Sequence, residues 1–206
     1  MSDAELDRGY DIIGDVHGCA HTLERLLEQM GYRRLNGVWQ HPRRQALFLG
    51  DIIDRGPRIR EALHLVRDMV EAGQARCIMG NHEFNAICWE TPAPPGSGRS
   101  YLREHTERHH RLIGDTLAQF DAWPQEWREF VQWFGDLPLF LDMGPFRLVH
   151  ACWDSSLIEP LRQDYPDGRI DDALLMGSAH WGSCPAPTFD RRLRGTDMGL
   201  PHGITM

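Results

Sequence analysis

The sequence predicts an α/β domain, because short apolar segments that end in glycine alternate with segments of helical periodicity. Three such segments, residues 10–13, 46–49 and 76–79, each lead directly into a glycine. Strands that alternate with helices are joined by crossover connections, which produce a largely parallel sheet. A length of 206 residues suits one domain, so we expect a single domain over residues 1–206.

The first half of the chain contains the clearest elements. Residues 10–13 read as a buried strand, and the leucines that follow recur at helical spacing up to Met30, where Gly31 is a natural stop. Residues 37–40 suggest a small hairpin arm. After the second strand, at 46–49, a helix is expected from Ile59 to Val70, and the third strand follows at 76–79.

The second half is less regular. Residues 91–98 are rich in proline and glycine and predict a surface loop. Residues from about 101 to 134 look helical, polar and tryptophan-bearing, so we expect a helical insert at about 92–135 that covers the pocket. Residues 139–141 and 146–149 flank a turn and predict a hairpin that leads to His150.

Polar groups follow each of the three apolar segments. The corresponding motifs are Gly14-Asp15-Val16-His17-Gly18, Gly50-Asp51-Ile52-Ile53-Asp54-Arg55-Gly56 and Gly80-Asn81-His82-Glu83. The carboxyl ends of parallel strands form the edge of a sheet where ligands bind, so three loops distant in sequence are expected to meet in one pocket.

The residue types at these strand ends are those of a metal site. Asp15 and His17 are two positions apart, which places both side chains on one face of an extended segment. Asp51 can bridge two cations, Asn81 offers an amide oxygen and His150 an imidazole. Each residue alone has a structural reading, such as a helix cap for an aspartate. Their joint occurrence at strand ends favours metal ligation.

This mixture of carboxylate, amide and imidazole suits first-row ions such as manganese, iron, cobalt, nickel or zinc better than calcium, and we expect two divalent ions, with manganese as the first choice. Two such ions, about 3.5–4 Å apart, clamp a phosphoryl oxygen and activate a shared water, whose hydroxide attacks phosphorus. His82 is placed to protonate the leaving oxygen, and Asp54 to orient His82 or to stabilise its charge. Arg55 offers donors for phosphate oxygens, and Glu83 is expected to be a structural partner.

Composition limits the function classes. A net charge of −8 argues against a nucleic-acid binder, which would show a basic stripe. The five cysteines contain no CxxC pair, and the acidic N-terminus has no apolar core of a signal peptide. No apolar run is long enough to span a membrane. We expect a cytoplasmic protein, and the sequence leaves its oligomeric state open.

The motifs resemble the calcineurin-like metallophosphoesterase superfamily, and within it the phosphoprotein-phosphatase branch, over about residues 9–155. Val149-His150-Ala151 is similar to bacterial diadenosine tetraphosphatases and serine/threonine phosphatases. The resemblance implies a four-layer α/β-β/α sandwich, with two mixed sheets and a dinuclear centre between them. It assigns Asp15, His17 and Asp51 to one metal, and Asp51, Asn81 and His150 to the other.

The same resemblance implies a further histidine ligand near the C-terminus, usually preceded by glycine. No Gly-His pair follows His150, and the remaining candidates, His180 and His202, lack the expected strand context. Our hypothesis is that the chain is shortened relative to its relatives and lacks this ligand and the last strands of the second sheet.

Three functions follow. The first is a phosphoesterase acting on a phosphoprotein, a phosphomonoester or a dinucleoside polyphosphate. The second is a catalytically impaired remnant that binds metal or phosphate, which the missing histidine motivates. The third is a regulatory protein that docks a partner through the tryptophans between Trp123 and Trp133, although core packing explains those residues more simply.

Overall fold

The fold is taken from a computed structural model of the chain, which describes residues 9–169, 171, 175 and 176. A parallel three-stranded sheet lies at its centre, in the order β1-β4-β5. These strands are β1 (Gly9–Ile13), β4 (Arg44–Phe48) and β5 (Ala75–Cys77). The register pairs Ile13 with Phe48 and Phe48 with Cys77, so the three strands end at the same edge. The predicted parallel sheet is confirmed.

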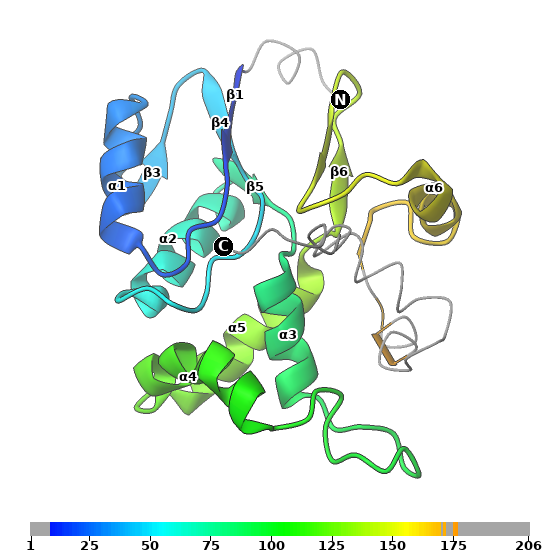
Figure 1. The fold of residues 1–206 in the computed structure, drawn as a ribbon. Helices are drawn as coiled ribbons and strands as arrows, with labels where there is room; N and C mark the ends of the chain where they lie inside the picture. The colour runs from blue at the N-terminus through cyan, green and yellow to red at the C-terminus, as the bar shows by residue number, and fades with distance from the viewer. Residues whose placement is uncertain (1–8, 170, 172–174, 177–206) are drawn as a thin grey trace, which may run out of the picture.

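Helices α1 (Ala20–Gln29) and α2 (Ile59–Glu71) are the two crossovers and cover one face of this sheet (Figure 1). Each presents an apolar stripe to the sheet, represented by Leu27 in α1 and Leu63 in α2, both fully buried. The arm between α1 and β4 is an antiparallel pair, β2 (Arg33–Leu35) and β3 (Val38–Gln40).

The other face of the sheet packs against a second pair of strands, β6 (Phe140–Asp142) and β7 (Arg147–Val149). A separate apolar cluster lies between them and contains Leu47, Ile78, Leu141, Met143 and Leu148. Helix α6 (Ser155–Asp164) lies beyond the pair (Figure 1), and its Arg162 forms an ion pair with Asp142 at 3.1 Å.

The succession of helices, sheet, strand pair and helix gives the four layers that the family resemblance implies, and it confirms the α/β class. Within the described residues the first sheet is entirely parallel and the second is one antiparallel pair. The hypothesis of missing C-terminal strands concerns residues outside the described part of the chain. His180 and His202 also lie outside it.

Three further helices gather at one end of the molecule (Figure 1): α3 (Asn81–Glu90), α4 (Glu107–Phe120) and α5 (Pro124–Asp136). Helix α4 begins where the Thr106 side chain accepts a hydrogen bond from His109 N, and α5 begins with proline at its first position. Both helices fall in the segment expected to be helical. That this segment is an insert in the domain stays a prediction.

The tryptophans of this segment are mostly internal. Trp127 and Trp133 are buried, and only Trp123 is exposed, with the Arg60 guanidinium 4.3 Å from its ring centre. This arrangement supports the packing explanation over a docking surface. No helix in the described part of the chain combines the length and the apolar character that crossing a membrane requires.

Candidate metal centre

The three motifs meet at the carboxyl ends of β1, β4 and β5, and backbone hydrogen bonds join the first two. The carbonyl oxygen of Asp51 accepts from the N–H groups of Val16 and His17 at 3.0 and 2.9 Å. Gly18 N donates to the Ile52 carbonyl at 2.7 Å. The loop after β1 is therefore held directly against the loop after β4.

Glu83 joins the loop after β4 to the start of α3. Its side chain is fully buried. One carboxylate oxygen accepts from Asp51 N at 2.8 Å and Gly80 N at 3.0 Å, and the other from Ile52 N at 2.8 Å. Because both oxygens are occupied by backbone donors, Glu83 serves as a structural partner, as the sequence predicted.

Glycines allow this close approach. A Cβ atom at Gly80 would overlap the backbone nitrogen and the carboxylate of Asp51, and one at Gly50 would overlap the backbone of Gly80. The two loops pass each other at backbone contact, so any side chain here would push them apart. These glycines are therefore required because no side chain fits between the two loops, and not only because glycine favours turns.

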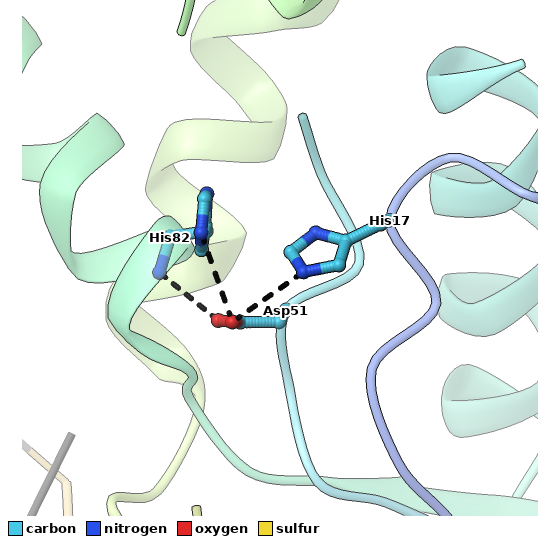
Figure 2. Close-up of side chains that lie close together, drawn as sticks. All are labelled: His17, Asp51 and His82. Carbon is cyan, nitrogen blue, oxygen red and sulfur yellow. Dashed lines mark hydrogen bonds and ion pairs between the residues drawn. The ribbon is translucent and has the colours of Figure 1, made fainter. Parts of the chain in front are cut away.

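Asp51 lies at the centre of the site (Figure 2). Its Oδ2 atom is 3.9 Å from His17 Nε2, 3.9 Å from His82 Nε2 and 3.4 Å from His150 Nε2. The Asp51 side chain is only 5% exposed, whereas that of Asp15, 3.6 Å from His17 Nε2, is 55% exposed. The site is therefore closed around Asp51 and open at Asp15.

The ring of His17 is oriented for ligation. Its Nδ1 atom lies 2.9 Å from the carbonyl oxygen of Ile53, which can only accept, so Nδ1 carries the hydrogen. In the neutral ring the lone pair is then on Nε2, which faces the two aspartates. Nε2 is buried and has no hydrogen-bond partner. A buried acceptor without a partner is costly, and a cation at this position would satisfy it.

His150 is held in the same way. Its Nδ1 lies 2.6 Å from the Leu49 carbonyl, and its Nε2 lies 3.2 Å from Asn81 Oδ1. A neutral Nε2 and an amide oxygen are both acceptors, so a cation or a proton must lie between them. Burial lowers the pKa of His150, but the hydrogen bond and charge of Asp51 outweigh it and raise the pKa to about 9. In the metal-free chain a proton takes this place.

The backbone is strained at the same positions. The described part of the chain has five non-glycine residues with positive φ, and four of them, His17, Asp51, Asp54 and Arg55, belong to the first two motifs. Such conformations cost about 1–3 kcal/mol each and persist where surrounding contacts impose them. Their concentration here is independent support for a functional site.

His82 lies beside the candidate metal ligands and pairs with Asp54. Its Nδ1 lies 2.5 Å from Asp54 Oδ2, and both side chains are buried. Burial lowers the pKa of His82, but the hydrogen bond to Asp54 and the charge of Asp51 exceed that effect, and the pKa is raised. Its Nε2 lies 3.4 Å from Nη2 of Arg55, whose side chain is exposed at the edge of the site.

The donor set fits divalent metal ions. Two groups have ligand atoms within 4.8 Å of one another: His17, Asp51 and His82 in one, and Asp15, Asp51 and His150 in the other. Asp51 belongs to both, as a bridging carboxylate must. The division of ligands between two metals that the family resemblance implies differs from these groups in where Asp15 and His82 fall, and it stays a prediction.

The structure brings together all eight residues proposed from the sequence: Asp15, His17, Asp51, Asp54, Arg55, Asn81, His82 and His150. Sequence reasoning missed Thr116, whose hydroxyl contacts Asp54 from α4. A threonine in a polar helix carries no local signal of such a contact.

Imidazole and carboxylate groups gathered at the carboxyl edge of a parallel sheet, between two β layers, are the arrangement expected of a metal-dependent α/β protein. The chain belongs to the calcineurin-like phosphoesterase family, whose family model matches residues 10–178.

Curated relatives support this family assignment. The chain is 32% identical to the asymmetrical bis(5'-nucleosyl)-tetraphosphatase PrpE of Geobacillus thermodenitrificans over an alignment of 211 positions, which covers 95% of this chain and 78% of that one. It is 42% identical to PrpE of Anoxybacillus flavithermus over 69% of this chain and 56% of that protein. With PrpE of Oceanobacillus iheyensis it shares 51% identity over 35% of this chain, but spans only 29% of that relative.

Among solved structures, a cold-active protein tyrosine phosphatase superposes with a TM-score of 0.50 and 20% identity, over 84% of this chain and 55% of that one. This likeness confirms the fold. The first relatives are matched over only part of their length, so their activity comes to this chain as a proposal.

Proposed function

We propose that the chain is a dinuclear metal-dependent phosphoester hydrolase. The observation that carries this proposal is the buried Asp51 carboxylate, which faces three imidazole Nε2 atoms, that of His17 without any hydrogen-bond partner. Of these three atoms, His17 Nε2 has no donor within reach, and a cation beside it and the Asp51 carboxylate would satisfy both.

Asp15, His17, Asp51, Asn81 and His150 would hold the ions, and we propose manganese as the ion. Two bound divalent ions would polarise a phosphoryl oxygen and lower the pKa of a water between them. The exposed edge at Asp15 leaves room for a phosphate group to enter.

The other residues act on the substrate. Asp54 holds the hydrogen of His82 on Nδ1, so a proton that His82 delivers to the leaving oxygen comes from Nε2. Arg55 places its guanidinium beside that same Nε2, where it can bind phosphate oxygens with two parallel hydrogen bonds. Proton donor and phosphate binder thus face the same position.

For the substrate class we propose a phosphate ester or anhydride, with a dinucleoside polyphosphate as the first candidate. The name of the PrpE relatives supports this choice. Phosphoproteins and simple phosphomonoesters are the alternatives, because the roles proposed for His82 and Arg55 involve only the phosphate and its leaving oxygen.

A panel of substrates tests the proposal. Diadenosine tetraphosphate, a phosphopeptide and 4-nitrophenyl phosphate would be incubated with the purified chain, with added manganese or with a chelator. We expect manganese-dependent turnover that Asp51→Asn reduces by at least about 100-fold. Asp68→Asn, an exposed aspartate on α2, is the matched control and should keep full activity.

Turnover by Asp51→Asn at the level of the unaltered chain would overturn the proposal. Stoichiometric metal binding without turnover of any phosphoester would instead support a binding protein that has lost catalysis.

A further inference from the structure

Helix α4 reaches the metal centre through one side chain. Thr116 is wholly buried, and its hydroxyl donates to Asp54 Oδ1 at 2.5 Å. The same hydroxyl oxygen accepts from Asp54 N at 3.1 Å. A backbone N–H can only donate, so the hydroxyl hydrogen is free to point at the carboxylate. Thr116, 62 positions away in the chain, therefore provides a hydrogen-bond partner for both the backbone N–H and the Oδ1 atom of Asp54.

These two bonds fix the conformation of Asp54. Its backbone has φ of 69°, a conformation that L residues rarely adopt. The bond to Asp54 N holds that backbone, and the bond to Oδ1 sets the rotation of the carboxylate. The second oxygen, Oδ2, is then aimed at His82 Nδ1, 2.5 Å away.

The neighbouring residue Gln119 steadies the same loop without contacting Asp54. One turn further along α4, its side chain accepts from Ile59 N at 2.6 Å and donates to the Gly56 carbonyl at 3.0 Å. Helix α4 therefore contacts the loop after β4 through both residues, and of these two it is Thr116 that bonds to Asp54.

We propose that Thr116 is a positioning residue that acts on the leaving-group proton transfer through Asp54 and His82. The inference rests on the proposed hydrolase function and deepens it. It gives the helical segment of residues 107–120 a role in the reaction: the helix supplies the contact that keeps the Asp54 carboxylate in register with His82.

The dependence of rate on the leaving group tests this role. Proton donation matters most when the leaving oxygen is strongly basic. The chain would be assayed with manganese on phenyl phosphate and on 4-nitrophenyl phosphate, whose leaving group is the more acidic. For Thr116→Val, which keeps the shape of the side chain but removes the hydroxyl, we expect kcat on phenyl phosphate to fall roughly 10- to 100-fold with little change in KM.

The loss on 4-nitrophenyl phosphate should be several times smaller. The ratio of the two kcat/KM values is measured on one protein sample, so it does not depend on the fraction that is folded. A Thr116→Val variant of low stability therefore still gives a decisive answer. Thr116→Ser retains the hydroxyl and should restore both rates to within about twofold.

Two controls complete the design. Thr91→Val removes a hydroxyl that donates to the Ile87 carbonyl at 2.7 Å, far along α3 from the metal centre, and should leave the ratio unchanged. In a His82→Gln background, Thr116→Val should cause no further loss, because the two residues act on one step.

Equal losses on both substrates, or additive losses in the double variant, would overturn the proposal for Thr116. Absence of manganese-dependent turnover of diadenosine tetraphosphate, the phosphopeptide and both aryl phosphates by the unaltered chain would instead overturn the hydrolase function itself. The two failures are therefore distinguishable.

Discussion

The Nε2 atom of His17 points at the carboxylate of Asp51 from 3.9 Å, is buried, and forms no hydrogen bond. An orphaned buried acceptor costs about 1–3 kcal/mol. The Ile53 carbonyl fixes the hydrogen on the opposite nitrogen, so the ring cannot relieve this cost by changing tautomer. The metal-free chain therefore carries a buried acceptor that a cation would satisfy.

Glu83 is expected to be essential for stability. In Glu83→Gln one acceptor oxygen becomes an NH₂ group that faces backbone N–H donors, so at least one loop hydrogen bond is lost. We expect the free energy of unfolding to fall by about 1–3 kcal/mol, measured by urea unfolding with a chelator present. Glu129→Gln, at an exposed position of α5, should change it by less than about 0.5 kcal/mol. An equal effect of both substitutions would contradict this role for Glu83.

Gly80→Ala should distort the metal centre. The added Cβ meets the backbone of Asp51, which cannot move without shifting its carboxylate. We expect a loss of about 1–3 kcal/mol in stability and weaker manganese binding. The matched control is Gly135→Ala, since a Cβ at this position in α5 meets nothing within 4 Å and alanine favours a helix. Calorimetric titration with manganese would measure both variants, and unaltered affinity in Gly80→Ala would be inconsistent with tight loop packing.

A third prediction concerns pH and an ion pair far from the metal centre. Hydrogen bonding to Arg44 is the main cause that lowers the pKa of Asp11, with help from Tyr32 at 3.1 Å. A carboxyl whose pKa is lowered on folding stabilises the fold above its unfolded pKa of about 4, and this contribution disappears as the pH falls through the folded value.

Asp11→Asn should therefore be less stable than the unaltered chain at pH 7, and the difference should shrink below about pH 4. Unfolding of both proteins would be followed in urea, with a chelator present, from pH 3 to 7. A difference that stays constant over this range would show that the charge of Asp11 does not matter.

The sequence predicted the strands and the metal-site loops because each has a recognisable local pattern of residues. An apolar segment, a glycine and an aspartate or asparagine identify the end of a buried strand, and parallel topology brings such ends together. Asp51 and Asn81 could be placed at one edge on that basis alone. His150 followed from the hairpin that ends beside β4.

Helix α3 was not predicted because it is buried around most of its circumference. Its buried residues include His82, Glu83, Ala86 and Trp89, so the sequence shows no one-sided apolar stripe. Helix α6 was missed because it is polar and contains Pro160. Thr116 could not have been found either, since its contact with Asp54 depends on how α4 packs and not on spacing along the chain.

Metal content is the most direct test of the dinuclear centre. The purified chain and Asp51→Asn would be dialysed to equilibrium against manganese, and bound metal would be measured by mass spectrometry. We expect about two ions per chain for the unaltered protein, because Asp51 belongs to both groups of candidate ligands. Asp51→Asn should retain one ion or none. Two ions retained by Asp51→Asn, or fewer than one bound by the unaltered chain, would contradict a centre built on this carboxylate.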